Sequence, residues 1–404
     1  MSNQNNKKVC VIGLGYIGLP TAALLANNNY EVLGVDTNKV AVDAINKGEI
    51  HIIEPNLDIY VKEAVSKGLL KAYSSTQPAD IYIICVPTPF HSNDGIPNPN
   101  IDYIKEATLS IAPIVKSGDM IILESTSPVG TTNYIQSILR EDNGVDNIYI
   151  GYCPERVLPG KILKELINND RVIGGVDKSS TQAISNFYKS FVEGEILETN
   201  AKTAEMCKLT ENSFRDVNIA LANELSMICE SDDINVWELI ELANHHPRVN
   251  ILQPGTGVGG HCIAVDPWFL VSAHPSKTRL IKSARLVNDS KPNWVSEQIF
   301  NLSKSSTIDN PKIACLGLSY KPDTDDLRES PAIEVVKDLI NKNLDVVTVE
   351  PNIRGDSKFS LVSLEEALID ANIIAVLVGH KEFVNNDKLN KDNRVVDFCG
   401  VLKR

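Results

Sequence analysis

A glycine-rich motif near the N-terminus constrains the fold of this chain more than any other feature. The apolar residues 9–12 predict a short strand, the motif Gly13-Leu-Gly-Tyr-Ile-Gly18 follows directly, and residues 19–27 favour a helix. Glycines at these places let the backbone and the helix N-terminus approach a pyrophosphate. The next predicted strand ends at Asp36, close to the spacing of about 20 residues at which a carboxylate binds the adenosine ribose. The pattern predicts a dinucleotide-binding unit, and NAD rather than NADP is expected because Asp36 would repel a 2′-phosphate.

Apolar segments continue to alternate with helical segments after this motif. Further buried strands of a parallel sheet are predicted at residues 81–86, 120–123 and 148–152. Each is followed by a loop rich in Pro, Thr, Ser or Glu, and ligands bind beyond the carboxyl ends of such strands. Thr88 and Thr126 are therefore candidate cofactor contacts, although residues that cap the next helix would have the same spacing. Glu155 and Arg156 place opposite charges at this edge, which favours a site over a solvated turn.

The middle of the chain predicts one long helix, because residues 199–232 contain neither Gly nor Pro. Its apolar stripe consists of Phe214, Val217, Leu221, Leu225 and Ile228. Its polar side carries Glu205, Lys208, Asn212 and Arg215. These polar residues form either a solvated face with ordinary ion pairs or a row of donors aimed into a cleft. Since isolated helices are marginally stable, we expect this helix to connect two domains and to pair with its copy in a homodimer.

A second glycine-rich segment runs from Gly255 to Pro267 and contains Cys262 and Asp266. Glycines lose much conformational freedom on folding, so such a loop favours a ligand cradle that presents the cysteine to the ligand. The alternative is that Cys262 is a buried thiol, which is the more common state of a cysteine outside disulfides.

The C-terminal part restarts the alternation, with predicted strands at residues 312–316, 345–349, 373–378 and 394–398. It lacks the glycine motif, so we expect it to hold a different nucleotide-like group. Lys321 and Arg328 could neutralise a diphosphate, and plain surface charge is the alternative. The predicted fold class is α/β, with two Rossmann-like doubly wound parallel-sheet domains joined by a long central helix. We assign an NAD-binding domain to residues 1–198, a central helical dimerisation and catalytic region to 199–300, and a second nucleotide-binding domain to 301–404.

The composition limits the kinds of partner. A net charge of -13 argues against non-specific binding to nucleic acid or to an anionic membrane. The eight cysteines include no CxxC pair and no His/Cys cluster of metal-ligand spacing, which favours reduced thiols and no metal. Residues 9–26 could be mistaken for a signal peptide or a membrane span, but their glycines and Pro20 fit a strand–turn–helix better. We therefore expect a cytoplasmic protein.

Specific motifs occur in order along the whole chain. They are Gly-Leu-Gly-Tyr-Ile-Gly-Leu-Pro20, Val-Pro-Thr-Pro89, Glu-Ser-Thr-Ser-Pro-Val-Gly130, Pro-Glu-Arg156, Glu-Met-Cys-Lys-Leu-Thr-Glu-Asn212 and Gly-Val-Gly-Gly-His-Cys262. Together they resemble the UDP-glucose/GDP-mannose dehydrogenase family, which implies oxidation of the C6 alcohol of a nucleotide sugar to a carboxylate by two NAD. The cysteine loop, with His261 before Cys262, most resembles the members that convert UDP-N-acetyl-D-mannosamine into the uronate.

The resemblance also implies roles for individual residues. Cys262 would be the nucleophile and Lys208 the general acid/base. The implied NAD contacts are Gly13, Gly15, Tyr16, Ile17, Gly18, Asp36, Thr88, Thr126 and Arg328. The implied substrate contacts are Arg156, Val157, Lys208, Asn212, Arg215, His246, Arg248, Gly259, Tyr320 and Lys321. Residues 301–404 would then bind the UDP-sugar, and the expected assembly is a homodimer or a higher homo-oligomer.

The residue types suit this chemistry. An aldehyde is a poor hydride donor until a nucleophile adds to it, and the Cys262 thiolate would form a thiohemiacetal that gives up a second hydride and becomes a thioester. Lys208 would favour the thiolate, and Lys208 with Asn212 would stabilise negative charge on oxygen. Water must then cleave the thioester, with Glu155 or Asp266 as the base.

Three alternatives stay open. One is a UDP-N-acetylglucosamine 6-dehydrogenase or another UDP-hexose 6-dehydrogenase, whose motifs would be nearly the same. The second is a two-electron hydroxyacid dehydrogenase, which needs no cysteine. The third is a catalytically silent nucleotide-binding protein, against which the presence of Cys262, Lys208 and Glu155 argues.

Overall fold

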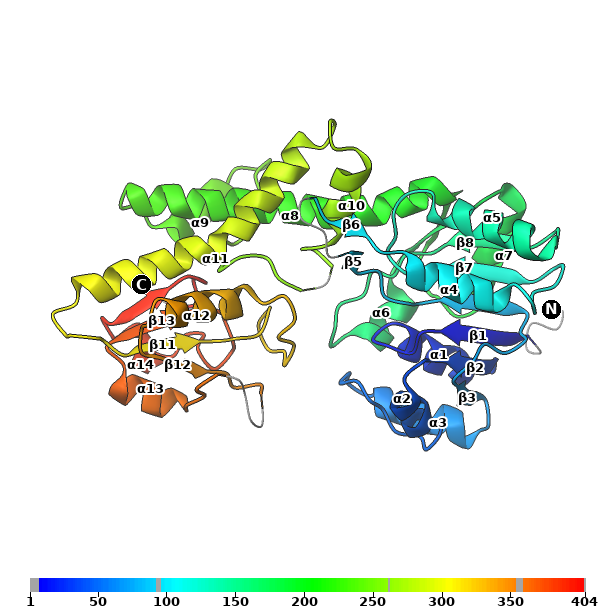
Figure 1. Ribbon diagram of the computed structural model, residues 1–404, viewed down its shortest axis with the longest axis horizontal. Helices are drawn as coiled ribbons and strands as arrows, with labels where there is room; N and C mark the ends of the chain where they lie inside the picture. Colours follow the sequence, from blue (N-terminus) through cyan, green and yellow to red (C-terminus); the bar gives the residue numbers. More distant parts are fainter. Residues whose placement is uncertain (1–6, 92–95, 261, 354–358, 403–404) are drawn as a thin grey trace. The chain divides into compact units, whose positions relative to one another are not determined.

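The computed structural model describes residues 7–91, 96–260, 262–353 and 359–402, with the backbone alone at 142 and 143. The chain divides into two compact units, Met1–Thr210 (unit 1) and Glu211–Arg404 (unit 2), and Figure 1 labels most of their elements. The boundary lies inside the long helix α8 (Ala201–Ser231), which therefore contributes residues to both units. None of the helices in the described ranges is long and apolar enough to cross a membrane.

Unit 1 is built on an eight-stranded sheet with the order β10-β9-β8-β7-β4-β1-β2-β3. Its strands are β1 (Lys8–Ile12), β2 (Glu31–Val35), β3 (Leu70–Tyr73), β4 (Ile81–Ile84), β7 (Met120–Leu123), β8 (Tyr149–Tyr152), β9 (Arg171–Gly175) and β10 (Ile196–Asn200). β1 lies between β2 and β4, so the order of strand addition reverses at β1. In doubly wound sheets ligands bind at the carboxyl ends of the strands where this reversal occurs.

Both faces of this sheet are covered by helices (Figure 1). Val9 and Val11 of β1 pack in one core with residues of α1 (Gly18–Asn27) and α3 (Leu57–Ser66). The alternate residues Cys10 and Ile12 pack in a second core with residues of α4 (Asp102–Ile111) and α5 (Thr131–Asn143). Because both faces are buried, successive residues of a strand must be apolar, which is why the strands were recognisable as continuous apolar runs.

The remaining elements of unit 1 are short connections or lie over the first core. They are α2 (Lys39–Ile45), β5 (Phe90–His91), β6 (Asn98–Pro99), α6 (Ile162–Asn168) and α7 (Lys178–Tyr188).

One strand pair departs from the predicted parallel arrangement. β9 runs antiparallel to β8 and pairs Gly175 with Gly151, whereas β10 runs parallel to β9. A Cβ atom on Gly151 would lie 2.9 Å from the carbonyl oxygen of Gly174, so glycine is required for this close pairing. The sequence analysis did not predict β3, β9 or β10.

Unit 2 contains a four-stranded parallel sheet with the order β12-β11-β13-β14. Its strands are β11 (Ile313–Leu316), β12 (Val346–Val349), β13 (Ile373–Val376) and β14 (Val395–Asp397). Its helices, besides the second half of α8, are α9 (Val236–Asn244), α10 (Asp266–Ala273), α11 (Arg279–Ser305), α12 (Pro331–Asn341), α13 (Leu364–Asp370) and α14 (Asp387–Asn390). Residues of α11 and α12 cover one face of the sheet, and residues of α13 and α14 cover the other. The predicted fold class, two Rossmann-like units and a long central helix, is confirmed.

Candidate active site

The glycine motif after β1 forms the tight turn that the sequence predicted. Gly13 has φ +91°, and a Cβ atom there would lie 2.6 Å from the carbonyl oxygen of Cys85. Gly18 is equally constrained, because its Cβ would meet the Gly13 carbonyl oxygen. A Cβ on Gly15 would meet nothing within 4 Å. Gly13 and Gly18 are therefore needed to close the turn, whereas Gly15 leaves open space beside the start of α1, as a dinucleotide cradle requires. Tyr16 and Ile17, also predicted as NAD contacts, are half-buried in this turn.

Asp36 follows β2 and is fixed by two backbone groups. Its Oδ2 accepts a hydrogen bond from Leu14 N at 2.9 Å, and its Oδ1 accepts one from Asn38 N at 2.8 Å. The carboxylate is therefore held against the glycine turn, at the position predicted for the ribose contact.

Thr88 and Thr126 lie together although they follow different strands. The Thr88 hydroxyl donates to the carbonyl oxygen of Thr126 at 2.7 Å, and the Ser125 hydroxyl donates to Val86 O at 2.7 Å. Neither threonine caps a helix, because the N-cap residues of α4 and α5 are Ile101 and Gly130. The helix-cap alternative is thus excluded, and the two loops form one connected edge.

Glu155 lies in the loop after β8 and is 7% exposed. Its Oε2 forms an ion pair with the Arg171 Nη1 at 2.7 Å, and its Oε1 accepts from Arg156 N at 2.6 Å. The Arg156 guanidinium donates to the carbonyl oxygen of Asp170, so that side chain folds back on its own unit. Val157 packs beside Leu24, Ile162 and Leu166 in a small apolar cluster. These contacts fix the loop, and they do not by themselves direct Arg156 or Val157 toward a ligand.

Lys208 projects from the first half of α8, and its Nζ donates to the main-chain oxygen of Glu155 at 2.8 Å. The two residues predicted to be catalytic in unit 1 are thus in direct contact. Glu205, predicted on the same polar face, is instead 0% exposed. Its carboxylate accepts from Gly130 N at 2.6 Å and Thr132 N at 2.7 Å at the start of α5. The prediction of one continuous polar face was wrong for Glu205, because that carboxylate caps a neighbouring helix.

In unit 2, Asn212 and Asp266 are joined by a hydrogen bond. The Asn212 Nδ2 donates to the Asp266 Oδ2 at 2.5 Å, and Asp266 is 2% exposed. The backbone N–H of Asp266 donates to the carbonyl oxygen of Cys262 at 2.8 Å. Cys262 itself is exposed, so the buried-thiol alternative is excluded. His261 lies outside the described residues. Arg215, further along α8, is exposed.

The cysteine loop uses most of its glycines for internal packing. A Cβ on Gly259 would lie 2.3 Å from Glu329 O, and one on Gly260 would lie 2.7 Å from the Tyr320 ring. Gly257 is similarly confined by Pro331. Only Gly255 among these four has nothing within 4 Å. The interpretation of all four glycines as a ligand cradle therefore needs correction, although the packing does bring the predicted substrate residues Gly259 and Tyr320 together.

The predicted cations of unit 2 have local partners. Arg328 pairs with Asp326 through Nη2 and Oδ2 at 2.6 Å, and the Lys321 ammonium lies 5.7 Å from the centre of the Tyr320 ring. The charge of Arg328 is thus largely compensated before any diphosphate or NAD approaches. His246 and Arg248 are exposed in the segment between α9 and the cysteine loop, where Arg248 N donates to His246 Nδ1 at 3.3 Å.

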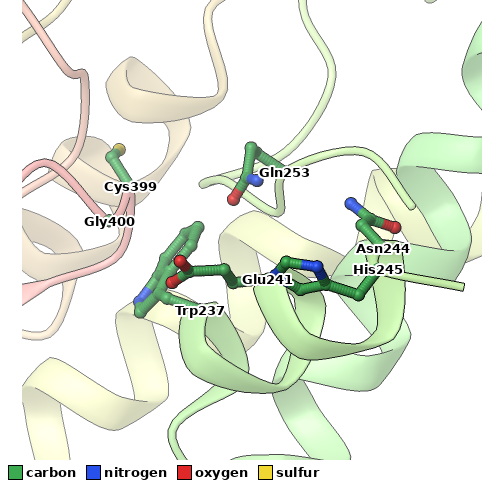
Figure 2. A pocket seen from close by; sticks show the side chains of 7 residues that line it. All are labelled: Trp237, Glu241, Asn244, His245, Gln253, Cys399 and Gly400. Carbon is green, nitrogen blue, oxygen red and sulfur yellow. The ribbon is translucent and has the colours of Figure 1, made fainter. Parts of the chain in front are cut away.

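Unit 2 also contains a cavity of about 570 Å³ that the sequence did not predict. It is lined by Trp237, Glu241, Asn244, His245, Gln253, Cys399 and Gly400, and Figure 2 shows Trp237 beside Gly400. None of the predicted site residues lines it. Because Glu241 contributes a carboxylate, this cavity is poorly suited to a diphosphate, and we do not assign the nucleotide to it.

Arg171 is a buried charged residue of the site region that sequence reasoning missed. It is 2% exposed, begins β9 and pairs with Glu155. The available signal was an arginine at the head of the short run Arg-Val-Ile-Gly-Gly175, because an arginine in a buried strand needs a carboxylate partner.

Unit 1 thus holds a glycine turn with a fixed carboxylate, as dinucleotide-binding units do, and unit 2 is a second α/β unit that carries an exposed cysteine. Three sequence models of one family match successive parts of the chain: the NAD binding domain at residues 7–192, the central domain at 202–290 and the UDP binding domain at 314–404. The chain therefore belongs to the UDP-glucose/GDP-mannose dehydrogenase family and is an NAD-dependent oxidoreductase, as the motifs implied.

Individual relatives are similar over nearly the whole length. A UDP-N-acetyl-D-mannosamine dehydrogenase of Campylobacter jejuni is 54% identical over 98% of this chain and 100% of that protein. An NDP-N-acetyl-D-galactosaminuronic acid dehydrogenase of Ralstonia nicotianae is 50% identical over 96% of this chain and 95% of that protein. The solved structure of a UDP-D-ManNAc dehydrogenase from Pyrococcus horikoshii matches with a TM-score of 0.90 and 39% identity, covering 98% of this chain and 96% of that one.

Proposed function

We propose that this protein oxidises UDP-N-acetyl-D-mannosamine at C6 to UDP-N-acetyl-D-mannosaminuronate, a four-electron oxidation that releases two NADH. The family membership supports a nucleotide-sugar substrate, and the names of the C. jejuni and P. horikoshii relatives support this particular sugar. The observation that carries the four-electron course is the exposed Cys262, tied through a backbone hydrogen bond to the buried Asp266. A two-electron dehydrogenase has no use for such a thiol.

In the proposed reaction, each predicted catalytic residue has its own role. NAD, when bound at the glycine turn, supplies the hydride acceptor. Lys208 takes the proton of the C6 hydroxyl as the alcohol becomes an aldehyde, and the Cys262 thiolate then adds to the aldehyde carbon. Lys208 and the Asn212 amide stabilise the oxygen of the resulting thiohemiacetal, which loses a second hydride and becomes a thioester. Water attacks the thioester carbon, the carboxylate product leaves, and the thiolate is regenerated.

Two carboxylates remain candidates for the base that activates this water. Asp266 is four residues from Cys262 and shares its local turn, while Glu155 is held as the partner of Arg171. The substitutions Asp266→Asn and Glu155→Gln each replace the carboxylate by an amide of the same shape, which cannot act as a base. The variant that lacks the base should release NADH in a burst and then accumulate a thioester on Cys262, detected by intact-protein mass spectrometry. The other variant should turn over without accumulating it, and if that variant is Glu155→Gln its turnover should be slower because Arg171 loses its buried partner.

The comparison with the R. nicotianae protein supports an N-acetylgalactosamine nucleotide sugar as the second candidate substrate. The R. nicotianae relative, named for N-acetyl-D-galactosaminuronic acid, is 50% identical, close to the value for the C. jejuni protein. Purified enzyme should therefore be assayed with UDP-N-acetylmannosamine, UDP-N-acetylgalactosamine, UDP-N-acetylglucosamine and UDP-glucose. The proposal expects the highest kcat/KM with the mannosamine sugar and two NADH per molecule oxidised. Preference for another sugar would overturn the substrate assignment, and one NADH per sugar would overturn the four-electron course.

We also propose that the enzyme is a homodimer that pairs through α8. The helix exposes Phe214 (68%), Leu221 (49%) and Ile228 (50%) at intervals of seven residues, which forms an apolar stripe. This supports the expectation that another copy covers the stripe. Sedimentation analysis should give twice the chain mass for the wild type, and Leu221→Glu should shift it toward the monomer. A monomeric wild type would contradict the proposal.

A further inference from the structure

Arg171 is a buried cation to which the proposed chemistry gives no role. Its Nη1 pairs with Glu155 Oε2 at 2.7 Å, its Nη2 donates to Leu166 O at 2.9 Å, and its Cζ lies 5.7 Å from the centre of the Tyr188 ring. Both members of the ion pair are nearly inaccessible, with side chains 2% and 6% exposed. A buried ion pair brings little net stability compared with apolar residues of the same volume, so stability alone is a weak reason for its presence.

Glu155 contacts both Arg171 and Lys208, the proposed general acid/base. Its carboxylate is held from one side by Arg171 and from the other by the N–H of Arg156 at 2.6 Å. Its main-chain oxygen accepts a hydrogen bond from the Lys208 ammonium at 2.8 Å. A guanidinium that fixes the Glu155 side chain therefore also fixes the carbonyl on which the Lys208 ammonium rests.

The Arg171 guanidinium is also linked, through Tyr188 and Glu124, to a residue that packs against the glycine turn. Tyr188, which lies under Arg171, donates its hydroxyl to Glu124 Oε1 at 2.6 Å. The other oxygen of Glu124 accepts from the Cys85 thiol at 3.2 Å, and the Cys85 carbonyl is the group that Gly13 packs against. Burial, together with the charge of Glu155, raises the pKa of Glu124, whereas Arg171 acts in the opposite direction.

We propose that Arg171 is a positioning residue for the reaction, acting through Glu155 on the placement and proton exchange of Lys208. The inference rests on the proposed function, in which Lys208 is the general acid/base. Lysine cannot replace arginine here, because one ammonium cannot form the forked contact with both Glu155 and Leu166 O. Arg171→Lys should therefore keep the buried charge while letting Glu155 move.

The first readout is the NADH burst of the first hydride transfer, which precedes thioester hydrolysis and so does not depend on the hydrolytic base. Arg171→Lys should lower the burst rate constant by about 10²-fold, the loss typical of a displacement of about 1 Å. The Kd for NAD should stay within about twofold of the wild-type value, because Arg171 reaches Gly13 only indirectly, through Tyr188, Glu124 and Cys85.

The second readout needs no turnover. The rate at which acetic anhydride acetylates Lys208, followed by mass spectrometry across a pH series, reports the state of its amine directly. Arg171→Lys should raise the rate of this labelling, because a Lys208 amine that no longer rests on the Glu155 main-chain oxygen is more accessible. Arg394→Lys is the matched control, because Arg394 also pairs with a carboxylate, Asp392, and donates to the carbonyl oxygen of Leu368, far from this site in the chain. It should leave both the burst and the labelling of Lys208 unchanged.

If Arg171→Lys does not fold, the double variant Arg171→Gln/Glu155→Gln can be tested in its place. Both buried residues are then neutral, so no uncompensated charge is left in the interior. The double variant should fold and still show the raised labelling rate of Lys208. Wild-type burst and labelling profiles in a folded Arg171 variant would overturn the inference. Absence of NADH from the wild-type enzyme would instead overturn the proposed function, and the labelling of Lys208 would still decide whether Arg171 acts on it.

Discussion

Asn212 and Asp266, 54 residues apart in the chain, are joined by a hydrogen bond of 2.5 Å between the side-chain amide and the Oδ2 atom. This bond ties the long helix α8 to the first residue of α10, and Asp266 in turn donates its backbone N–H to the carbonyl oxygen of Cys262 at 2.8 Å. The thiol thus lies on a turn that is anchored to the helix carrying the predicted oxyanion contact.

Asp36 should decide the choice of dinucleotide. Replacing it by Ala removes a charged acceptor, which is worth about 1.5–3 kcal/mol, so the Kd for NAD should rise by about tenfold or more. The repulsion of a 2′-phosphate disappears at the same time, and the ratio of NAD to NADP affinity should fall. Isothermal titration with both dinucleotides measures this. An unchanged ratio would contradict the ribose assignment.

The cysteine loop should tolerate alanine at one glycine and not at another. A Cβ on Gly259 would collide with Glu329 O, whereas Gly255 has open space around it. Gly259→Ala should lower the free energy of unfolding by about 1–3 kcal/mol, as overpacking does. Gly255→Ala is the matched control and should stay within about 0.5 kcal/mol of the wild type. Chemical denaturation of both variants checks the difference, and equal effects would show that internal packing does not explain the glycines.

The stability contribution of Lys291 should depend on pH. Burial lowers the pKa of this lysine to about 7, although its ammonium lies 3.8 Å from the centre of the Trp294 ring. The unfolded chain binds this proton up to about pH 10.4, so the folded state gains stability as pH rises from about 7 toward 10. Lys291→Met should therefore stabilise the protein most at pH 6, with a gain that shrinks by pH 9. Thermal unfolding at both values tests it, with the exposed Lys388→Met as control; a gain that does not change with pH would contradict it.

The cysteines should differ sharply in reactivity. Cys262 is exposed, whereas burial raises the pKa of Cys153 and Cys315, both 0% exposed, to about 12. Because the thiolate is the reactive form, iodoacetamide near pH 8 should alkylate Cys262 well before these two. Peptide mapping by mass spectrometry gives the order. Prior alkylation of a buried cysteine would show that the accessibilities are different in solution.

The sequence predicted the parts of the fold that follow from local patterning. Apolar runs located β1, β4, β7 and β8 because these strands are buried on both faces. β9 was missed, because its antiparallel pairing depends on Gly174 and Gly175 meeting Gly151 of β8, a contact across the intervening loop and helix. No local pattern encodes such a long-range contact.

The candidate site rests on patterns of the same kind. Motifs predict roles for Lys208, Asn212 and Cys262, since chemistry restricts which residue types can serve there, and these roles stay predictions. Spacing on a helix placed Glu205 beside them, but its partners Gly130 and Thr132 come from another element and bury it. Arg171 went unnoticed because its role depends on its pairing with Glu155 in another loop, although the arginine at the head of an apolar run was a usable signal.

The most direct test of the central claim is to follow Cys262 during turnover. Wild-type enzyme with UDP-N-acetylmannosamine and excess NAD should yield two NADH per sugar, and Cys262→Ala should retain NAD binding but lose the overall oxidation to the uronate. In whichever of Asp266→Asn and Glu155→Gln lacks the hydrolytic base, intact-protein mass spectrometry should find the uronyl group on the peptide that contains Cys262. Full turnover with two NADH in Cys262→Ala would contradict the covalent route.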